Sequence, residues 1–129
     1  MRRLAVALGI VAPLMMFGFA NAAAAAPMTK IVQVGSTWTD EVVGQGCAVE
    51  TIGQSHTFTD DIGGGGTYTG GAAKVHFKLT SGADARSAFK GTWSASQNEY
   101  VGNWTGGPVR GSAGYWVPGH VPTFDGFTC

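Results

Sequence analysis

The sequence predicts an all-β protein, most simply a small antiparallel β-barrel of about eight strands, with a β-sandwich as the alternative. Short stretches alternate apolar and polar residues, and glycine-rich breaks separate them at intervals of about ten residues. No stretch after residue 27 sustains the i, i+3, i+4 apolar spacing of a helix. Gly91 and Gly102 stand among aromatic residues at inward positions, which favours the strong curvature of a small barrel.

The first 26 residues have the pattern of a secretory signal peptide. Arg2 and Arg3 precede an apolar stretch over residues 4–20, and an alanine-rich segment follows it. We therefore expect residues 1–26 to be removed and residues 27–129 to form one secreted β-barrel domain.

The charge of residues 27–129 is low and slightly negative. Without Arg2 and Arg3, six Lys and Arg residues remain against eight Asp and Glu, a net charge near −2. No basic run is longer than one residue, so we expect neither nucleic-acid binding nor attachment to a membrane. The protein is expected to be a monomer or a small homo-oligomer.

Cys47 and Cys129 are the only cysteines. In an exported protein, two cysteines most simply form one disulfide. Because the bond closes a long loop, the chain-entropy model gives it a stabilisation of roughly 4 kcal/mol.

In the first half of the domain, five segments are expected to be strands. Residues 30–34 and 37–43 are the first two, and Trp38 lies in the second of them. The other three are residues 48–52, residues 55–59 with His56 and Phe58 on one face, and residues 67–69.

The second half shows the clearest alternation. In residues 73–79, Ala73, Val75, Phe77 and Leu79 face one side, and Lys74, His76 and Lys78 face the other. Residues 89–96 and 99–105 are expected to form a hairpin with a two-residue turn at Gln97 and Asn98. A further strand is expected at residues 115–117, ended by Pro118 and Gly119, and a tail follows over residues 121–129.

The glycine-rich segment DDIGGGGTYTGG, residues 60–71, is interpreted as a turn that leads into a short strand. It lacks the lysine and the following helix of a phosphate-binding loop. The chain is too short to need it as a linker between domains. Asp60 and Asp61 are expected to cap the turn, and Tyr68 is the one large side chain of the strand.

Residues 63–77, with Tyr68, Gly70 and Val75, resemble the glycine–aromatic–glycine stretch of secreted bacterial barrels related to allene oxide cyclase and dirigent proteins. This resemblance implies an eight-stranded barrel with an apolar interior, often assembled as a dimer or trimer. Gly71 and Ala73 depart from the pattern of that family. The catalytic residues of those enzymes have no counterparts that we can place in this sequence, so the resemblance does not imply cyclase activity.

The sequence contains no motif that identifies a catalytic or metal site. His56, His76 and His120 are not spaced as paired metal ligands, so we expect no metal and no cofactor. A triad of Ser112, His120 and Asp125 can be written, but it has no supporting motif. A pair of carboxylates for glycoside hydrolysis could come from several acids, which the sequence does not rank: Asp40, Glu41, Glu50, Asp60, Asp61 and Glu99.

Aromatic residues are the most informative set. Leucine and isoleucine are too few to build a core, so most aromatic side chains are expected to be interior. The remainder could line a pocket or form a stacking surface. The candidate ligand-binding residues are Tyr68, His76, Trp93, Tyr100 and Trp104.

The function that these features favour is a secreted binding or interaction protein that takes a small apolar ligand. An extracellular barrel enzyme of the cyclase or isomerase type is one alternative, and a surface structural protein without a ligand is another. A buried carboxyl or histidine with a shifted pKa inside a pocket would favour the enzyme.

Overall fold

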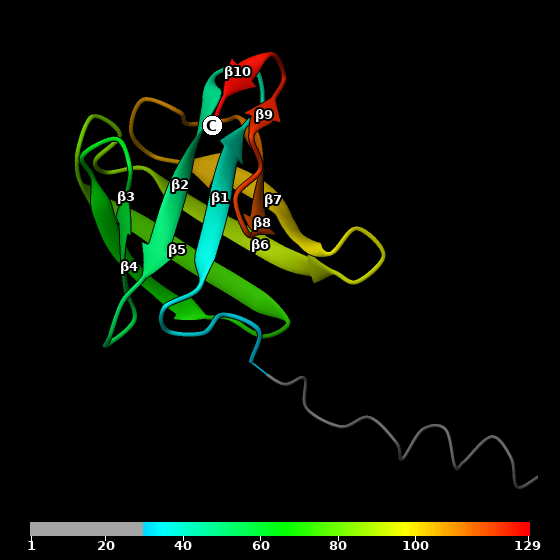
Figure 1. Cartoon of the computed structure of the whole chain (residues 1–129). Coiled ribbons are helices and arrows are strands. Elements are labelled where there is room, and N and C mark those ends of the chain that lie inside the picture. Colours follow the sequence, from blue (N-terminus) through cyan, green and yellow to red (C-terminus); the bar gives the residue numbers. More distant parts are fainter. Residues whose placement is uncertain (1–29) are drawn as a thin grey trace, which may run out of the picture.

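A computed structural model describes residues 30–129, so the expected signal peptide lies outside the described residues. Eight antiparallel strands close into a barrel, and a short two-stranded hairpin follows them (Figure 1). The barrel strands are β1 (Thr37–Val42), β2 (Gly46–Ile52), β3 (Thr57–Asp60), β4 (Gly65–Gly70), β5 (Lys74–Ser81), β6 (Ala88–Ser94), β7 (Glu99–Thr105) and β8 (Ala113–Pro118). The hairpin consists of β9 (Thr123–Phe124) and β10 (Phe127–Thr128). Residues 30–129 contain no helix and therefore none that could cross a membrane.

Each strand pairs with the next in sequence, and β1 pairs with β8 to close the barrel. In the closing pair Trp38 lies opposite Pro118, and Val42 lies opposite Gly114. The predicted barrel of eight strands is therefore confirmed, and the alternative of a sandwich is wrong. The predicted hairpin of β6 and β7 is present, with Gly91 opposite Gly102.

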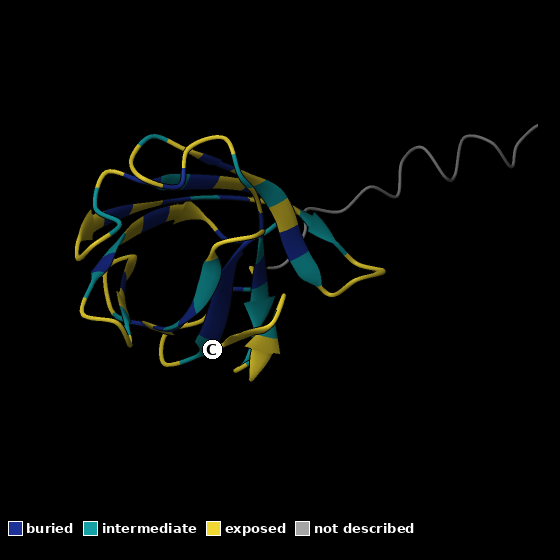
Figure 2. Cartoon of the chain, turned by 90° about the horizontal axis from the view of Figure 1, so that it is seen from above, coloured by how far each residue is buried: buried dark blue, intermediate teal, exposed yellow. Residues whose placement is uncertain are grey.

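Aromatic side chains fill most of the interior. Trp116, with no exposed surface, lies at the centre of the cluster, with its ring 4.5 Å from that of Trp38 and 5.0 Å from that of Phe77. Seen from above, the buried positions alternate with exposed ones along the strands (Figure 2). The expectation that most aromatic residues are interior is confirmed for the core, which comprises Trp38, Phe58, Tyr68, Phe77, Phe89, Tyr100, Trp104 and Trp116.

Glycine is required where strands approach closely. A Cβ atom at Gly102 would lie 1.8 Å from the carbonyl oxygen of Lys90, and one at Gly91 would lie 2.6 Å from the ring of Phe89. No side chain fits at either position, which confirms that these glycines relieve crowding where the wall curves.

Residues 30–34 do not form the predicted strand. The amides of Ile31 and Val32 both donate to the carbonyl of Gly71, and the Val32 side chain is buried in the core. This segment, coloured light blue to cyan in Figure 1, passes across one end of the barrel and covers it. Val32 and Ile31 pack against the core at the end of the barrel, whereas Val34 is exposed.

Two local predictions are corrected by the turns. His56 does not share a face with Phe58, because it has a positive φ of 59° in the turn before β3 and is exposed. The turn between β6 and β7 contains four residues rather than two, since Ser94 pairs with Glu99. The last barrel strand ends at Pro118, as predicted.

The segment DDIGGGGTYTGG forms the predicted turn and strand. Asp60 Oδ1 accepts the amides of Ile62 and Gly64, so Asp60 caps the turn as expected. Asp61 instead accepts the amide of Val49 on the neighbouring strand β2. Tyr68 is buried at the centre of β4.

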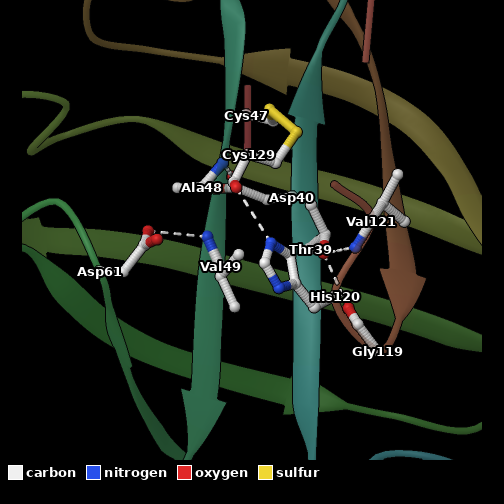
Figure 3. Close-up of a disulfide and its surroundings, with 10 residues drawn as sticks. All are labelled: Thr39, Asp40, Cys47, Ala48, Val49, Asp61, Gly119, His120, Val121 and Cys129. Carbon is white, nitrogen blue, oxygen red and sulfur yellow. Dashed lines mark hydrogen bonds between the residues drawn. A yellow bond between two sulfur atoms is a disulfide. The ribbon is translucent and has the colours of Figure 1, made fainter. Parts of the chain in front are cut away.

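The residues after β8 return along the outside of β1 to the start of β2 (Figure 3). Thr39 Oγ1 donates to the carbonyl of Gly119 and accepts the amide of Val121. The predicted disulfide between Cys47 and Cys129 is present, with Cα atoms 5.3 Å apart. It indicates an oxidising environment for the folded protein.

Candidate functional site

The barrel has an open end towards which the arrow of β1 points in Figure 1. Four connections meet there, the ones that follow β1, β3, β5 and β7. A cavity of about 200 Å³ lies between them, which we call the mouth cavity. Its lining comprises Asp40, Val42, Gln45, Gly46, Cys47, Ala48, Asp60, Ile62, Leu79, Asp84, Trp104 and Val109.

Asp40 is the most buried acid in the lining of the mouth cavity, with 6% of its surface exposed. It lies on β1 opposite Ala48, and its Oδ1 accepts the amide of Ala48 at 2.9 Å. The pKa of the Asp40 carboxyl is raised to about 7, mainly by burial and to a smaller extent by the nearby charges of Asp60 and Asp84. Hydrogen bonds from Ala48 and Glu50 limit the rise.

Glu50 lies deeper in the barrel and has no exposed surface. Its Oε2 accepts the indole N–H of Trp116 at 2.6 Å, whereas its Oε1 has no donor among the described residues. Burial raises the pKa of Glu50 well above its usual range, and the charge of Asp40 adds to the shift. Two ionised carboxyls cannot hydrogen-bond to each other, so the hydrogen bond between Asp40 and Glu50 requires a proton.

We assign that proton to Glu50 at neutral pH. Glu50 is more fully excluded from water than Asp40, and an ionised carboxylate without water or a cation is costly to bury. A protonated Glu50 gives Oε1 a hydrogen to donate to Asp40 and leaves Oε2 free to accept from Trp116. The pair then carries at most one negative charge, and this charge lies on the side of the mouth cavity.

The rest of the lining combines two further carboxylates with an apolar wall. Asp60 is the last residue of β3, and Asp84 lies in the connection between β5 and β6. Leu79, Trp104 and Val109 supply the apolar wall. Within residues 30–129, no three His, Cys, Asp or Glu side chains are grouped tightly enough to hold a metal ion.

Glu41 is buried on the other side of β1, under the segment that follows β8. It is 4% exposed because this segment, which includes Gly119 and Val121, covers the outer face of the strand. Burial raises the pKa of the Glu41 carboxyl to about 7, and the charges of Glu99 and Asp125 add to the effect. Consequently β1 carries acids that are shielded from solvent on both of its faces.

The structure does not bring the five predicted ligand-binding residues together in one site. Tyr68 and Tyr100 lie within the aromatic core, where the Tyr100 hydroxyl donates to the carbonyl of Ala72. Trp93 is half-buried against Trp38. Trp104 alone lines the mouth cavity, and His76 lies on the outer face of β5.

The residues of the sequence-derived triad also have separate partners. Ser112 accepts from Gln45, His120 contacts the carbonyl of Cys129, and Asp125 accepts the amide of Gly44. No hydrogen bond joins any two of the three residues.

Asp40 and Glu50 appeared in the sequence only as two of several possible acids. The available signal was their position, because each is an acid at an inward place on a strand flanked by apolar inward neighbours, such as Trp38 and Val42 around Asp40. Comparisons with known protein families, with characterised proteins and with solved structures gave no match. The structure has the eight-stranded barrel that the resemblance implied, but these comparisons identify no family.

Proposed function

We propose that the protein binds a small organic cation, such as a primary amine with a short apolar chain, in the mouth cavity. The observation that carries the proposal is the Asp40 carboxyl, which is almost fully buried and lines a cavity whose other wall is apolar. An ammonium group next to Asp40 would supply the positive charge that this buried carboxyl lacks.

The remainder of the lining supports a cation of this size and chemistry. Asp60 and Asp84 add negative charge around the opening, and the face of Trp104 can interact with a cation. The three carboxyls surround the cavity instead of converging on a point, which suits an organic cation better than a metal ion. A volume of about 200 Å³ restricts the ligand to a small molecule, because pockets for larger ligands start at about 300 Å³.

The experiment compares charged and neutral ligands of the same shape by isothermal titration calorimetry at pH 8. We expect butylamine to bind and butanol not to bind, and Asp40→Asn to weaken butylamine binding by about tenfold or more. The matched control is Asp61→Asn, which removes an exposed carboxylate outside the cavity and should leave binding unchanged. Equal binding of the amine and the alcohol, or equal loss in both variants, would refute the proposal.

A second candidate function is acid–base catalysis on a small carbonyl compound. The observation that favours it is the pKa of Asp40, raised to about 7 by burial, which makes this carboxylate a base near neutral pH. Its test is the exchange of α-protons of dihydroxyacetone in deuterated water, followed by NMR. Catalysis requires exchange above the buffer rate that Asp40→Asn abolishes, and exchange equal in the two proteins would exclude it.

A further inference from the structure

Positive charge is concentrated on the outer wall of the barrel, on the hairpin of β5 and β6. These strands lie opposite β1 and β2 in the closed barrel and are seen behind them in Figure 1. Of the six Lys and Arg residues in the expected domain, four belong to this hairpin: Lys74, Lys78, Arg86 and Lys90. His76 lies between Lys74 and Lys78 on the same face.

The alternation of the strand places these groups in a row. Lys74, His76 and Lys78 occupy every second position of β5, and Lys90 lies directly opposite His76 on β6. The amide of Arg86 donates to the carbonyl of Leu79, so Arg86 follows at the end of the row. Because a strand rises about 3.3 Å per residue, the row is about 20 Å long.

Two adjoining hollows lie along this row, which we call the basic track. The first, of about 360 Å³, is lined by Thr69, Gly70, Lys74, Val75, His76, Lys90, Gly91 and Thr92. The second, of about 440 Å³, is lined by Lys78, Leu79, Thr80, Arg86, Ser87 and Ala88. Lys74, Lys78, Arg86 and Lys90 are all exposed, so their charged groups are accessible.

Among residues 30–129, the lining of the two hollows includes no acidic side chain. The cross-strand neighbours of this face are Thr67 and Thr69 on β4 and Asn103 and Val101 on β7. Burial lowers the pKa of His76, and the charges of Lys90 and Lys78 lower it further, with no carboxylate acting in the opposite direction. Asp84, the one acid of the hairpin connection, lines the mouth cavity instead.

Lys74, Lys78 and Lys90 lie around His76 on one face of the hairpin, so a ligand that supplies negative charge would be attracted to this face. The second hollow also contains a buried polar atom that needs a partner. Ser87 has no exposed surface, and its Oγ has no hydrogen-bond partner among the described residues. Because this hydroxyl is enclosed, the groups that a ligand can reach in the second hollow are the exposed side chains of Lys78, Thr80 and Arg86.

We propose that the basic track binds a linear acidic polysaccharide, with the cations contacting successive carboxylate or sulfate groups and the exposed hydroxyls of Thr69, Thr80 and Thr92 contacting the sugar. A row of single charges along a strand matches a polymer that carries charge at intervals better than it matches one small anion. The two hollows contain no aromatic side chain, whereas proteins that bind single-stranded nucleic acids stack the bases on aromatic rings. The proposal is independent of the function proposed for the mouth cavity.

The test measures binding of polygalacturonate and dextran sulfate by calorimetry, with neutral dextran as the uncharged reference. We expect both anionic polymers to bind, with an affinity that falls as salt is added. Lys74→Gln combined with Lys90→Gln should weaken binding by about tenfold. The matched control is Lys30→Gln combined with Arg110→Gln, which changes the net charge equally at exposed positions outside the track.

Three outcomes would overturn the proposal. The first is binding of the anionic polymers no tighter than that of neutral dextran. The second is an equal loss in the two double variants, which would mean that only net charge matters. The third is tighter binding of oligo(dT) or of phosphatidylglycerol vesicles than of either polysaccharide. All the substituted side chains are exposed, so thermal unfolding should confirm that every variant is folded.

Discussion

The mouth cavity collects carboxyl groups inside the barrel, whereas the basic track collects ammonium groups on its outer wall. At the mouth, Asp40 and Glu50 are enclosed. Burial raises the pKa of both carboxyls and so favours their neutral, protonated form. On the track, the side chains of Lys74 and Lys90 are exposed to water. The same fold therefore controls charge in two ways, by suppressing it in the interior and by displaying it outside.

The largest expected difference between the two regions is in the pH dependence of stability. The folded-state pKa of Asp40 is raised to about 7, so between pH 4 and pH 7 the folded protein holds a proton that the unfolded chain releases. Stability should therefore fall as pH rises through this window, by on the order of 4 kcal/mol for Asp40 at 1.36 kcal/mol per pKa unit. Glu50 and Glu41, whose pKa values are also raised, change stability in the same direction.

Urea denaturation at pH 4.5, 6 and 7.5 measures this slope. We expect Asp40→Asn to flatten it, because asparagine keeps the oxygen that accepts the amide of Ala48 and does not titrate. The control Asp61→Asn should keep the slope of the wild type. Parallel curves for wild type and Asp40→Asn would show that Asp40 titrates normally in the folded state.

The next largest expected effect is a difference in stability between a substitution in the interior and one on the outer wall. Glu50→Ala opens a cavity and leaves the indole N–H of Trp116 without an acceptor, so we expect a loss of about 3 kcal/mol at pH 5. Lys90→Ala on the track should change stability by less than about 0.5 kcal/mol. Urea denaturation midpoints measure the stability of both variants. If Glu50→Ala lost less stability than Lys90→Ala, the hydrogen bond between Glu50 and Trp116 would be contradicted.

The smallest expected effect has the opposite sign. Lys90 faces His76 across the strand pair, and Lys78 lies two residues further along β5. Lys90→Gln removes one positive charge from a face that also carries Lys74 and Lys78, so we expect it to raise the unfolding free energy by about 0.5 kcal/mol in low salt. The gain should disappear in 1 M NaCl, because salt screens exposed charges. A gain that persists in high salt would assign the effect to something other than repulsion.

Alternation of residue types was enough to predict much of the fold. Val75, Phe77 and Leu79 face the interior as expected, and Lys74, His76 and Lys78 were placed on the outer face correctly. The basic track is not visible in the linear sequence, because its lysines are not adjacent along the chain. A strand shows only every second residue on a face, and Lys90 joins the row through β-sheet pairing.

The mouth cavity was harder to predict, for a physical reason. Its lining comes from four connections and their flanking strands, which meet only when the barrel closes. The acids of β1 were uninformative in the sequence because the whole strand from Trp38 to Val42 is buried. One face is covered by the core and the other by the segment after β8, and no local pattern shows that a distant segment covers a strand.

The closure of β1 on β8 also determines the order in which the molecule can assemble. Thr39 contacts Gly119, which lies 80 positions later in the chain, so the first barrel strand must wait for nearly the whole domain before its second neighbour is available. Contacts between residues this far apart in sequence slow folding, whereas the hairpin of β6 and β7 needs only local contacts and can form early. Cys129 follows β8 and is bonded to Cys47 at the start of β2, so the disulfide joins the end of the chain to the strand beside β1. The bond therefore holds together, through a covalent link, the same two ends of the domain that the β1–β8 pairing joins through hydrogen bonds.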